Sequence, residues 1–112
     1  MYNVVFSSIF YDDISSSHNY IKENLQAPMA AENLKSELLE KIEYIKKNPY
    51  ARPLVQDRCL ASLGVRAIKV KKYLLLYKIK EHEENEKEFI YVIRFMYSKR
   101  DWVNIIKNES IN

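Results

Sequence analysis

Two stretches of the sequence decide the fold: "LGVRAIKVKKYLLLYKI" (63–79) and "FIYVIRFMYSKRDW" (89–102). Their apolar side chains alternate with polar ones or run continuously, and both patterns are typical of β-strands. The first stretch predicts two strands, "VRAIKV" and "YLLLYKIK", and the second predicts another. The acidic segment "EHEENEKE" (81–88) between them predicts a hairpin loop. Three consecutive strands in this order predict an antiparallel sheet.

The alternation also assigns side chains to the faces of this sheet. Arg66, Ile68 and Val70 fall on one face of the first strand, and Lys69 falls on the other. "YLLLYKIK" begins apolar on both faces, as a central strand does. Strict alternation in the last strand puts four residues on one face: Ile90, Val92, Arg94 and Met96. We therefore expect Arg94 on an open face of the sheet, near Lys69.

The first half of the chain predicts a strand (2–6) followed by two helices. In the segment 8–25 the spacing of three and four residues marks one helical face, formed by Tyr11, Ile14, His18, Ile21 and Leu25. A second helix is expected over 28–47, with Pro28 in its first turn and a buried stripe of Ala30, Leu34, Leu38, Ile42 and Ile45. A short connection between them predicts a helical hairpin.

The remaining segments complete an α+β fold. Residues 48–64, with two prolines and the only glycine, predict a long connection, and "KRDWVNIIK" (99–107) predicts a short closing helix with Trp102, Ile105 and Ile106 inward. The expected order is β-α-α-β-β-β-α, with the helices on one face of the sheet. At 112 residues, with 47% hydrophobic and 29% charged residues, the chain is expected to form a single globular domain over 1–112.

Composition excludes several classes of protein. The lone Cys59 rules out an intramolecular disulfide and fits a reducing compartment. The sequence contains no run of the roughly 20 apolar residues that a membrane span needs, so a cytoplasmic location without membrane contact is expected. The "HEENE" segment that begins at His82 does not have the His-Glu-x-x-His spacing of a zinc site. No metal or other cofactor is predicted.

Positive charge gathers in the second half of the chain. Residues 52–80 hold eight basic residues against one acid, a balance of +7, although the whole chain carries only +3. Such asymmetry can attract a polyanion or an acidic partner. Lysines on exposed strand faces would give the same count, and the sequence leaves both interpretations open.

The residues of the sheet resemble the RelE/ParE superfamily of bacterial toxins. That family shows a Gly-x-Arg-x-hydrophobic-x-Val strand, a Tyr-x-x-x-Tyr strand and a strand that ends in Arg-Asp. The corresponding residues here are Gly64, Arg66, Ile68, Val70, Tyr73, Tyr77, Arg100 and Asp101. The helical hairpin and its closing proline also agree, so the resemblance covers nearly the whole chain.

The resemblance implies a toxin of a type II toxin–antitoxin system, held inactive by a cognate antitoxin. RelE-like members cleave messenger RNA on the ribosome, whereas ParE-like members block DNA gyrase and act in plasmid stabilisation. An RNase must activate a 2′-hydroxyl and hold the phosphorane with cations. Four residues are the candidates for that catalysis if the chain is an RNase: Lys69, Arg94, Tyr97 and Arg100.

Two departures favour a ParE-like toxin that binds a macromolecular target. Ala67 occupies one of the family's RNase lysine positions, and Leu74 occupies the position of its third-strand arginine. Losing that arginine would remove roughly 2–4 kcal/mol of transition-state stabilisation. The alternatives are a RelE-like ribosome-dependent endoribonuclease and a degenerate, non-toxic module that only binds a partner.

Partner-binding residues are expected on the sheet and at the end of its last strand. Leu74 and Leu76 form an apolar patch that an antitoxin helix or a second copy of the chain would cover. Trp102 flanks the basic cluster, and Arg66 is expected at the sheet margin, in an ion pair or a partner contact. Arg100 is either a phosphate or partner anchor, or a structural partner of Asp101.

Overall fold

The computed structural model describes residues 1–109. Its elements follow the expected order with two additions, a π-helical turn η1 and a short helix α3. They are β1 (Val4–Phe6), α1 (Ser8–Asn19), η1 (Tyr20–Asn24), α2 (Pro28–Lys47), α3 (Arg58–Ser62), β2 (Arg66–Val70), β3 (Tyr73–Glu81), β4 (Glu88–Tyr97) and α4 (Trp102–Lys107). The α+β class is therefore confirmed.

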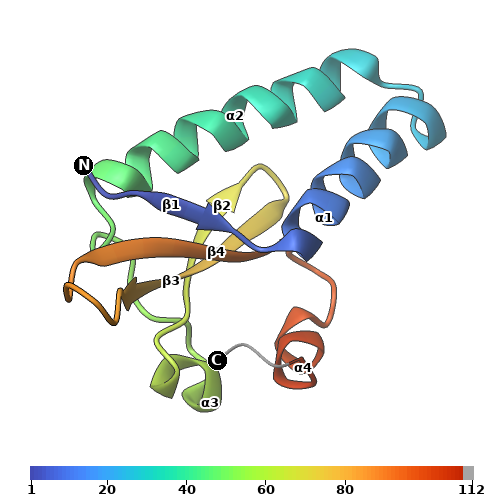
Figure 1. Ribbon diagram of the computed structural model, residues 1–112. Helices are drawn as coiled ribbons and strands as arrows, with labels where there is room; N and C mark the ends of the chain where they lie inside the picture. The colour runs from blue at the N-terminus through green and yellow to red at the C-terminus, as the bar shows by residue number, and fades with distance from the viewer. Residues whose placement is uncertain (110–112) are drawn as a thin grey trace.

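The four strands form one mixed sheet in the order β1-β4-β3-β2. The pairs β2–β3 and β3–β4 are antiparallel, as the sequence predicts, and the acidic loop joins β3 to β4. The N-terminal strand β1 runs parallel to β4, with Val5 opposite Tyr91. This pairing places the helical hairpin next to the last strand, far from it in sequence (Figure 1).

Helices cover both faces of the sheet, and the prediction of helices on one face is wrong. The α1–α2 hairpin lies over one face, and α3 and α4 lie under the other (Figure 1). Each layer encloses its own apolar core: Leu38 and Ile45 of α2 pack with Leu75 of β3, whereas Leu60 of α3 and Ile106 of α4 pack on the opposite face. Because β3 and β4 are apolar on both sides, burial of both faces is the favourable arrangement.

A β-bulge interrupts the alternation of β4. Leu76 pairs with Arg94, but the next residue, Tyr77, pairs with Val92, so Ile93 is the extra residue. One extra residue reverses the faces of the side chains beyond it. Val92 therefore packs in the core under the hairpin, whereas Ile93 packs in the core beside α3 and α4. The strict alternation predicted for this strand is wrong.

The buried stripes of the hairpin helices differ slightly from the prediction. Ser7 is the N-cap of α1, where its hydroxyl accepts a hydrogen bond from the backbone N–H of Phe10 at 3.2 Å. Phe10 and Ser17 are buried in α1, while Tyr11 is exposed. In α2 the stripe consists of Ala31, Leu34, Leu38, Ile42 and Ile45, so Ala31 takes the place expected for Ala30. No helix within residues 1–109 is long and apolar enough to span a membrane.

Candidate functional site

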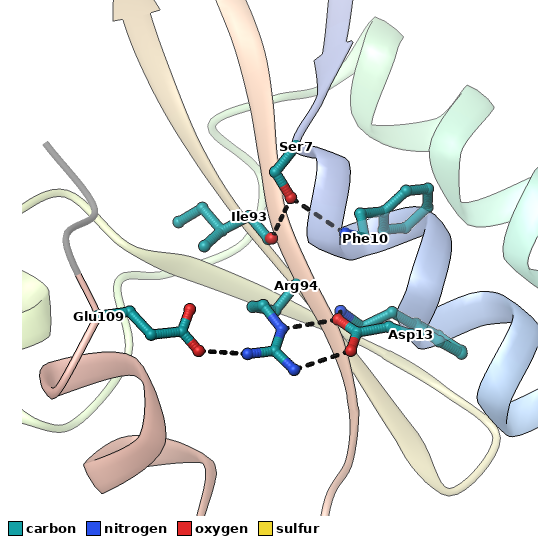
Figure 2. Close-up of polar contacts among 7 residues, drawn as sticks. Ser7, Phe10, Asp13, Ile93, Arg94 and Glu109 are labelled. Atoms are coloured by element: carbon teal, nitrogen blue, oxygen red, sulfur yellow. Dashed lines mark hydrogen bonds and ion pairs between the residues drawn. The ribbon is translucent and has the colours of Figure 1, made fainter.

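Arg94 lies at the bulge of β4 and is held by two carboxylates (Figure 2). Its Nε donates to Oδ2 of Asp13 at 2.7 Å, and its Nη2 donates to Oδ1 of the same residue at 2.8 Å. Its Nη1 donates to Oε1 of Glu109. Only 6% of Arg94 is exposed. These hydrogen bonds, led by those to Asp13, raise the pKa of the guanidinium above its ordinary value.

Asp13 also closes the free edge of β4 where β1 ends. Its Oδ2 accepts a hydrogen bond from the backbone N–H of Phe95 at 3.0 Å. Two residues earlier in β4, the carbonyl oxygen of Ile93 accepts a hydrogen bond from the Ser7 hydroxyl at 2.5 Å (Figure 2). The start of α1 thus supplies the partners that a longer β1 would have supplied. Arg94 and Asp13 together act as a structural connection between α1 and β4.

The expectation that Arg94 lies on an open face is therefore wrong, because Arg94 is buried. Arg94 pairs with Leu76 and is buried between Asp13 of α1 and Glu109, which follows α4. Lys69 is exposed on the edge strand β2. It lines a hollow of about 510 Å³ with Glu40, Lys41 and Arg52.

Three of the four candidate RNase residues do meet around one hollow. Arg94, Tyr97 and Arg100 line a space of about 550 Å³ between α1 and the end of β4. Asp12 and Asp13 line the same space, so two arginines face two aspartates there. A phosphate entering it would meet carboxylates as well as cations, and this balance weakens anion binding.

Leu76 belongs to the core and does not form an open patch. It is fully buried in the cluster that contains Leu60 of α3 and Ile106 of α4. Leu74, which pairs with Lys69, is half-buried against the same cluster, and so is Ala67. The expectation that a partner covers the patch at Leu76 is wrong, because the chain's own helices cover it.

Arg66 lies on the edge strand β2, and Trp102 lies in α4 below the sheet. Arg66 donates from Nη1 to the carbonyl oxygen of Arg52 at 2.5 Å, and its guanidinium lies 5.2 Å from the centre of the Tyr50 ring. The partners found for Arg66 are thus a carbonyl and an aromatic ring. Trp102 begins α4 and packs half-buried against the core below the sheet.

Arg100 and Asp101 have separate surroundings. Arg100 is exposed and lines the hollow beside Tyr97. Asp101 is the N-cap residue of α4, and its Oδ2 accepts a hydrogen bond from Nδ2 of Asn104 at 2.9 Å. The polar partner of the Asp101 side chain is therefore Asn104 of α4. This arrangement leaves the Arg100 side chain at the surface.

A groove lined by three tyrosines adjoins the hollow that Arg94, Tyr97 and Arg100 line. The sequence analysis did not predict this groove. Its volume is about 790 Å³, and it lies between the closed end of the helical hairpin and the β2–β3 turn. We call it the tyrosine groove, lined by Tyr20, Ile21, Leu25, Ala30, Asn33, Leu34, Lys71, Lys72, Tyr73 and Tyr97. Tyr20, Tyr73 and Tyr97 also line the hollow that Arg100 borders, so the two spaces share part of their lining.

The floor of the tyrosine groove is an aromatic stack. The Tyr73 ring lies parallel to Phe95 at a centroid distance of 4.9 Å and meets Tyr97 edge-on at 5.7 Å. Burial, together with the nearby Tyr20 and Tyr97, raises the pKa of Tyr73 above its ordinary value. A signal for this site existed in the sequence, because Tyr73 and Tyr97 lie directly opposite each other once the register of β3 and β4 is known.

Within residues 1–109, no group of three or more His, Cys, Asp or Glu side chains is arranged to hold a metal ion. His82 stacks on the ring of Phe89 at a centroid distance of 4.3 Å. Cys59 is exposed on α3. Neither residue contributes to the hollow or to the tyrosine groove.

Comparison with known proteins supports the resemblance seen in the sequence. The family model described as the ParE toxin of the type II toxin-antitoxin system, parDE, matches residues 4–102. No curated protein matches the chain. The family match runs from β1 to the first residue of α4, so it includes the whole sheet and the helical hairpin. The chain therefore belongs to the ParE toxin family of type II toxin–antitoxin systems, within the RelE/ParE superfamily.

Proposed function

We propose that this chain is a cytoplasmic toxin that arrests growth by binding DNA gyrase, and that a cognate antitoxin neutralises it. The observation that carries the choice of gyrase over messenger RNA is the sequestration of Arg94. Three of its nitrogen atoms donate to Asp13 and Glu109. A guanidinium that already forms these bonds in a buried position is not free to hold a phosphorane.

The apolar packing around the sheet supports the same choice. Leu74 and Ala67 stand where RelE-like RNases have cations, and both pack against the core beside α3 and α4. Lys69 lies on the edge strand β2, which β3 separates from the β4 strand of Arg94. Cleavage of RNA needs a base, an acid and cations around one phosphate, and Lys69 does not line the hollow that Arg94, Tyr97 and Arg100 share. We infer that the exposed end of β4, around Arg100, acts as a binding surface.

Induced expression in bacteria tests the proposal. We expect growth arrest, relief of the arrest when the antitoxin is co-expressed, accumulation of DNA breaks and intact transcripts by primer extension. The purified chain should inhibit DNA supercoiling by gyrase, and the same amount mixed with antitoxin should not. Transcripts cut in the reading frame, with normal supercoiling activity, would contradict the choice of gyrase.

One observation favours an endoribonuclease as the second candidate function. Arg94, Tyr97 and Arg100 line a single hollow, so three of the four candidate catalytic residues are close together. If the chain cuts messenger RNA, Tyr97→Phe should abolish cleavage and leave the fold unchanged, because Tyr97 is exposed. An absence of growth arrest on induction would instead favour a non-toxic module that only binds a partner.

A further inference from the structure

We propose that the β2 edge of the sheet binds the phosphate backbone of duplex DNA, independently of base sequence and separately from the surface around Arg100. The sequence alone leaves open whether the positive charge of residues 52–80 attracts a polyanion or only faces solvent. The fold gathers part of this charge at one edge of the sheet. We call the residues that carry the inference the edge cations: Lys41, Arg52, Arg66 and Lys69.

A hollow between α2 and β2 collects three of the edge cations. Lys41, Arg52 and Lys69 line this space of about 510 Å³, and Glu40 is the acid in its lining. The hollow that Arg100 borders has a different balance, because two arginines face two aspartates there. The hollow at β2 therefore has the excess of positive charge that attracts an anion.

Acids that lie close to this edge along α2 are engaged by other lysines. Glu37 pairs with Lys71 at 3.7 Å, and Glu43 pairs with Lys46 at 3.2 Å. Within residues 1–109, none of the four edge cations forms an ion pair. Four cations beside Glu40 give this edge a net charge of +3. Each cation can therefore approach a phosphate without first breaking an ion pair with a carboxylate.

The segment that carries Arg52 is already fixed against β2. The Tyr77 hydroxyl donates to the carbonyl oxygen of Pro49 at 2.9 Å, and Nη1 of Arg66 donates to the carbonyl oxygen of Arg52 at 2.5 Å. Two residues further on, Leu54 forms a β-bridge with Arg66. Because this backbone is ordered before binding, a ligand loses less of its binding free energy to ordering the site.

The tyrosines at this edge favour a duplex over a single strand. Proteins that bind single strands stack successive bases on exposed aromatic rings. Here one face of the Tyr50 ring carries the Arg66 guanidinium at 5.2 Å, and the Tyr50 hydroxyl donates to Glu88 at 2.5 Å. Tyr44 lines the hollow and is 42% exposed, so its hydroxyl can donate to a phosphate oxygen. Cations beside a hydroxyl donor suit the phosphates on the outside of a duplex.

The test measures binding of the purified chain to a fluorescent DNA duplex of mixed sequence, without gyrase, over a range of salt concentrations. Contacts to three or four phosphates should give a slope of about −3 in the logarithm of the association constant against the logarithm of the salt concentration. Lys41→Gln and Arg52→Gln should each make this slope shallower by about one and weaken binding by about tenfold at low salt. Arg52→Lys keeps the charge and should keep the slope.

Lys35→Gln is the matched control, because Lys35 is exposed on the same helix as Lys41 but does not line the hollow. It should bind DNA within about twofold of the wild type, since it removes the same charge away from the proposed contact. Far-ultraviolet circular dichroism would verify that all variants are folded. A duplex of unrelated sequence should bind as well as the first, and a single-stranded RNA of the same length should bind more weakly.

The measurement separates this inference from the proposed function. Normal supercoiling by gyrase, together with the expected slope and the expected losses in the variants, would overturn the proposed function and leave this inference standing. Four results would overturn the inference even if the chain inhibits gyrase: no binding to the duplex, wild-type binding by Lys41→Gln and Arg52→Gln, an equal loss for Lys35→Gln, or tighter binding to the RNA.

Discussion

Arg94 and Asp13, which are 81 residues apart in sequence, form a two-bond ion pair that joins β4 to α1. The same aspartate accepts a hydrogen bond from the backbone N–H of Phe95. One carboxylate therefore bonds both the Arg94 guanidinium and the backbone of β4 at the bulge. Glu109 adds a contact from the segment after α4. Arg94 therefore links the first helix, the last strand and the C-terminal segment, which explains its burial without a catalytic role.

Replacing Asp13 with alanine is expected to lower the free energy of unfolding by about 3–5 kcal/mol, because it leaves a buried guanidinium with Glu109 alone. Urea unfolding followed by circular dichroism measures the change. Asp12→Ala is the control, because Asp12 is exposed on the same turn of α1; its effect should stay within about 0.5 kcal/mol. Equal stability of the two variants would contradict the structural role of the ion pair.

Leu76→Ala is expected to lower the free energy of unfolding by about 2–5 kcal/mol, because it opens a cavity between the sheet and α3 and α4. Leu74→Ala, at a half-buried position in the same strand, should cost less. Both variants should bind the antitoxin like the wild type under conditions in which they are folded. A Leu76→Ala variant that is stable but binds the antitoxin poorly would restore the original expectation of a partner-binding patch at this residue.

The order of the elements and the family could be predicted from the sequence because both rest on local patterns. The period of two in β2 places Ile68 and Val70 in the core under the hairpin, as predicted. The burial of Arg94 could not be predicted, since it depends on a bulge that a single extra residue, Ile93, creates in β4. A bulge leaves no mark on composition or on the apolar pattern, yet it reverses the faces of a strand.

The tyrosine groove could not be predicted for a different reason. Its wall combines Tyr20 of the hairpin with Tyr73 and Tyr97 of two strands. Strand register explains why the two strand tyrosines are neighbours, but the approach of Tyr20 follows only from the packing of α1 and α2 on the sheet. The helical period also failed to identify the groove, because it put Leu25 on the same helical face as Ile14 and Ile21, whereas Leu25 caps the π-helical turn and is exposed. Arg100 lies three residues beyond the end of β4 and is exposed.

Alkaline titration should reveal tyrosines that ionise late. Burial raises the pKa of Tyr77 from 10.0 to about 12, and its hydroxyl donates to the carbonyl oxygen of Pro49 at 2.9 Å. A hydrogen bond to Glu88, the larger cause, raises the pKa of Tyr50 from 10.0 to about 12. Tyrosinate absorbance should therefore keep rising up to about pH 12 in the folded chain, and Tyr77→Phe should remove part of that late rise.

The same shift predicts how stability depends on pH. The folded chain holds the Tyr77 proton at a pH where the unfolded chain has already lost it, so this group's contribution to stability is complete below pH 10. The contribution is lost as the pH rises from 10 towards about 12. Urea midpoints measured across this range should fall more steeply for the wild type than for Tyr77→Phe. Parallel curves for the two proteins would show that Tyr77 does not hold its proton in the fold.

Arg100 is expected to contribute to growth arrest through its exposed side chain at the end of β4. Arg100→Ala should raise the concentration needed to inhibit gyrase by about tenfold, as loss of an arginine anchor at an interface does, and Arg100→Lys should recover part of the loss because it keeps the charge. The fold should tolerate both changes, since Arg100 is exposed. Lys69→Ala is the control, because Lys69 lies on the edge strand β2 and does not line the hollow that Arg100 borders. Equal losses for Arg100→Ala and Lys69→Ala, with cut transcripts, would favour RNA cleavage over gyrase binding.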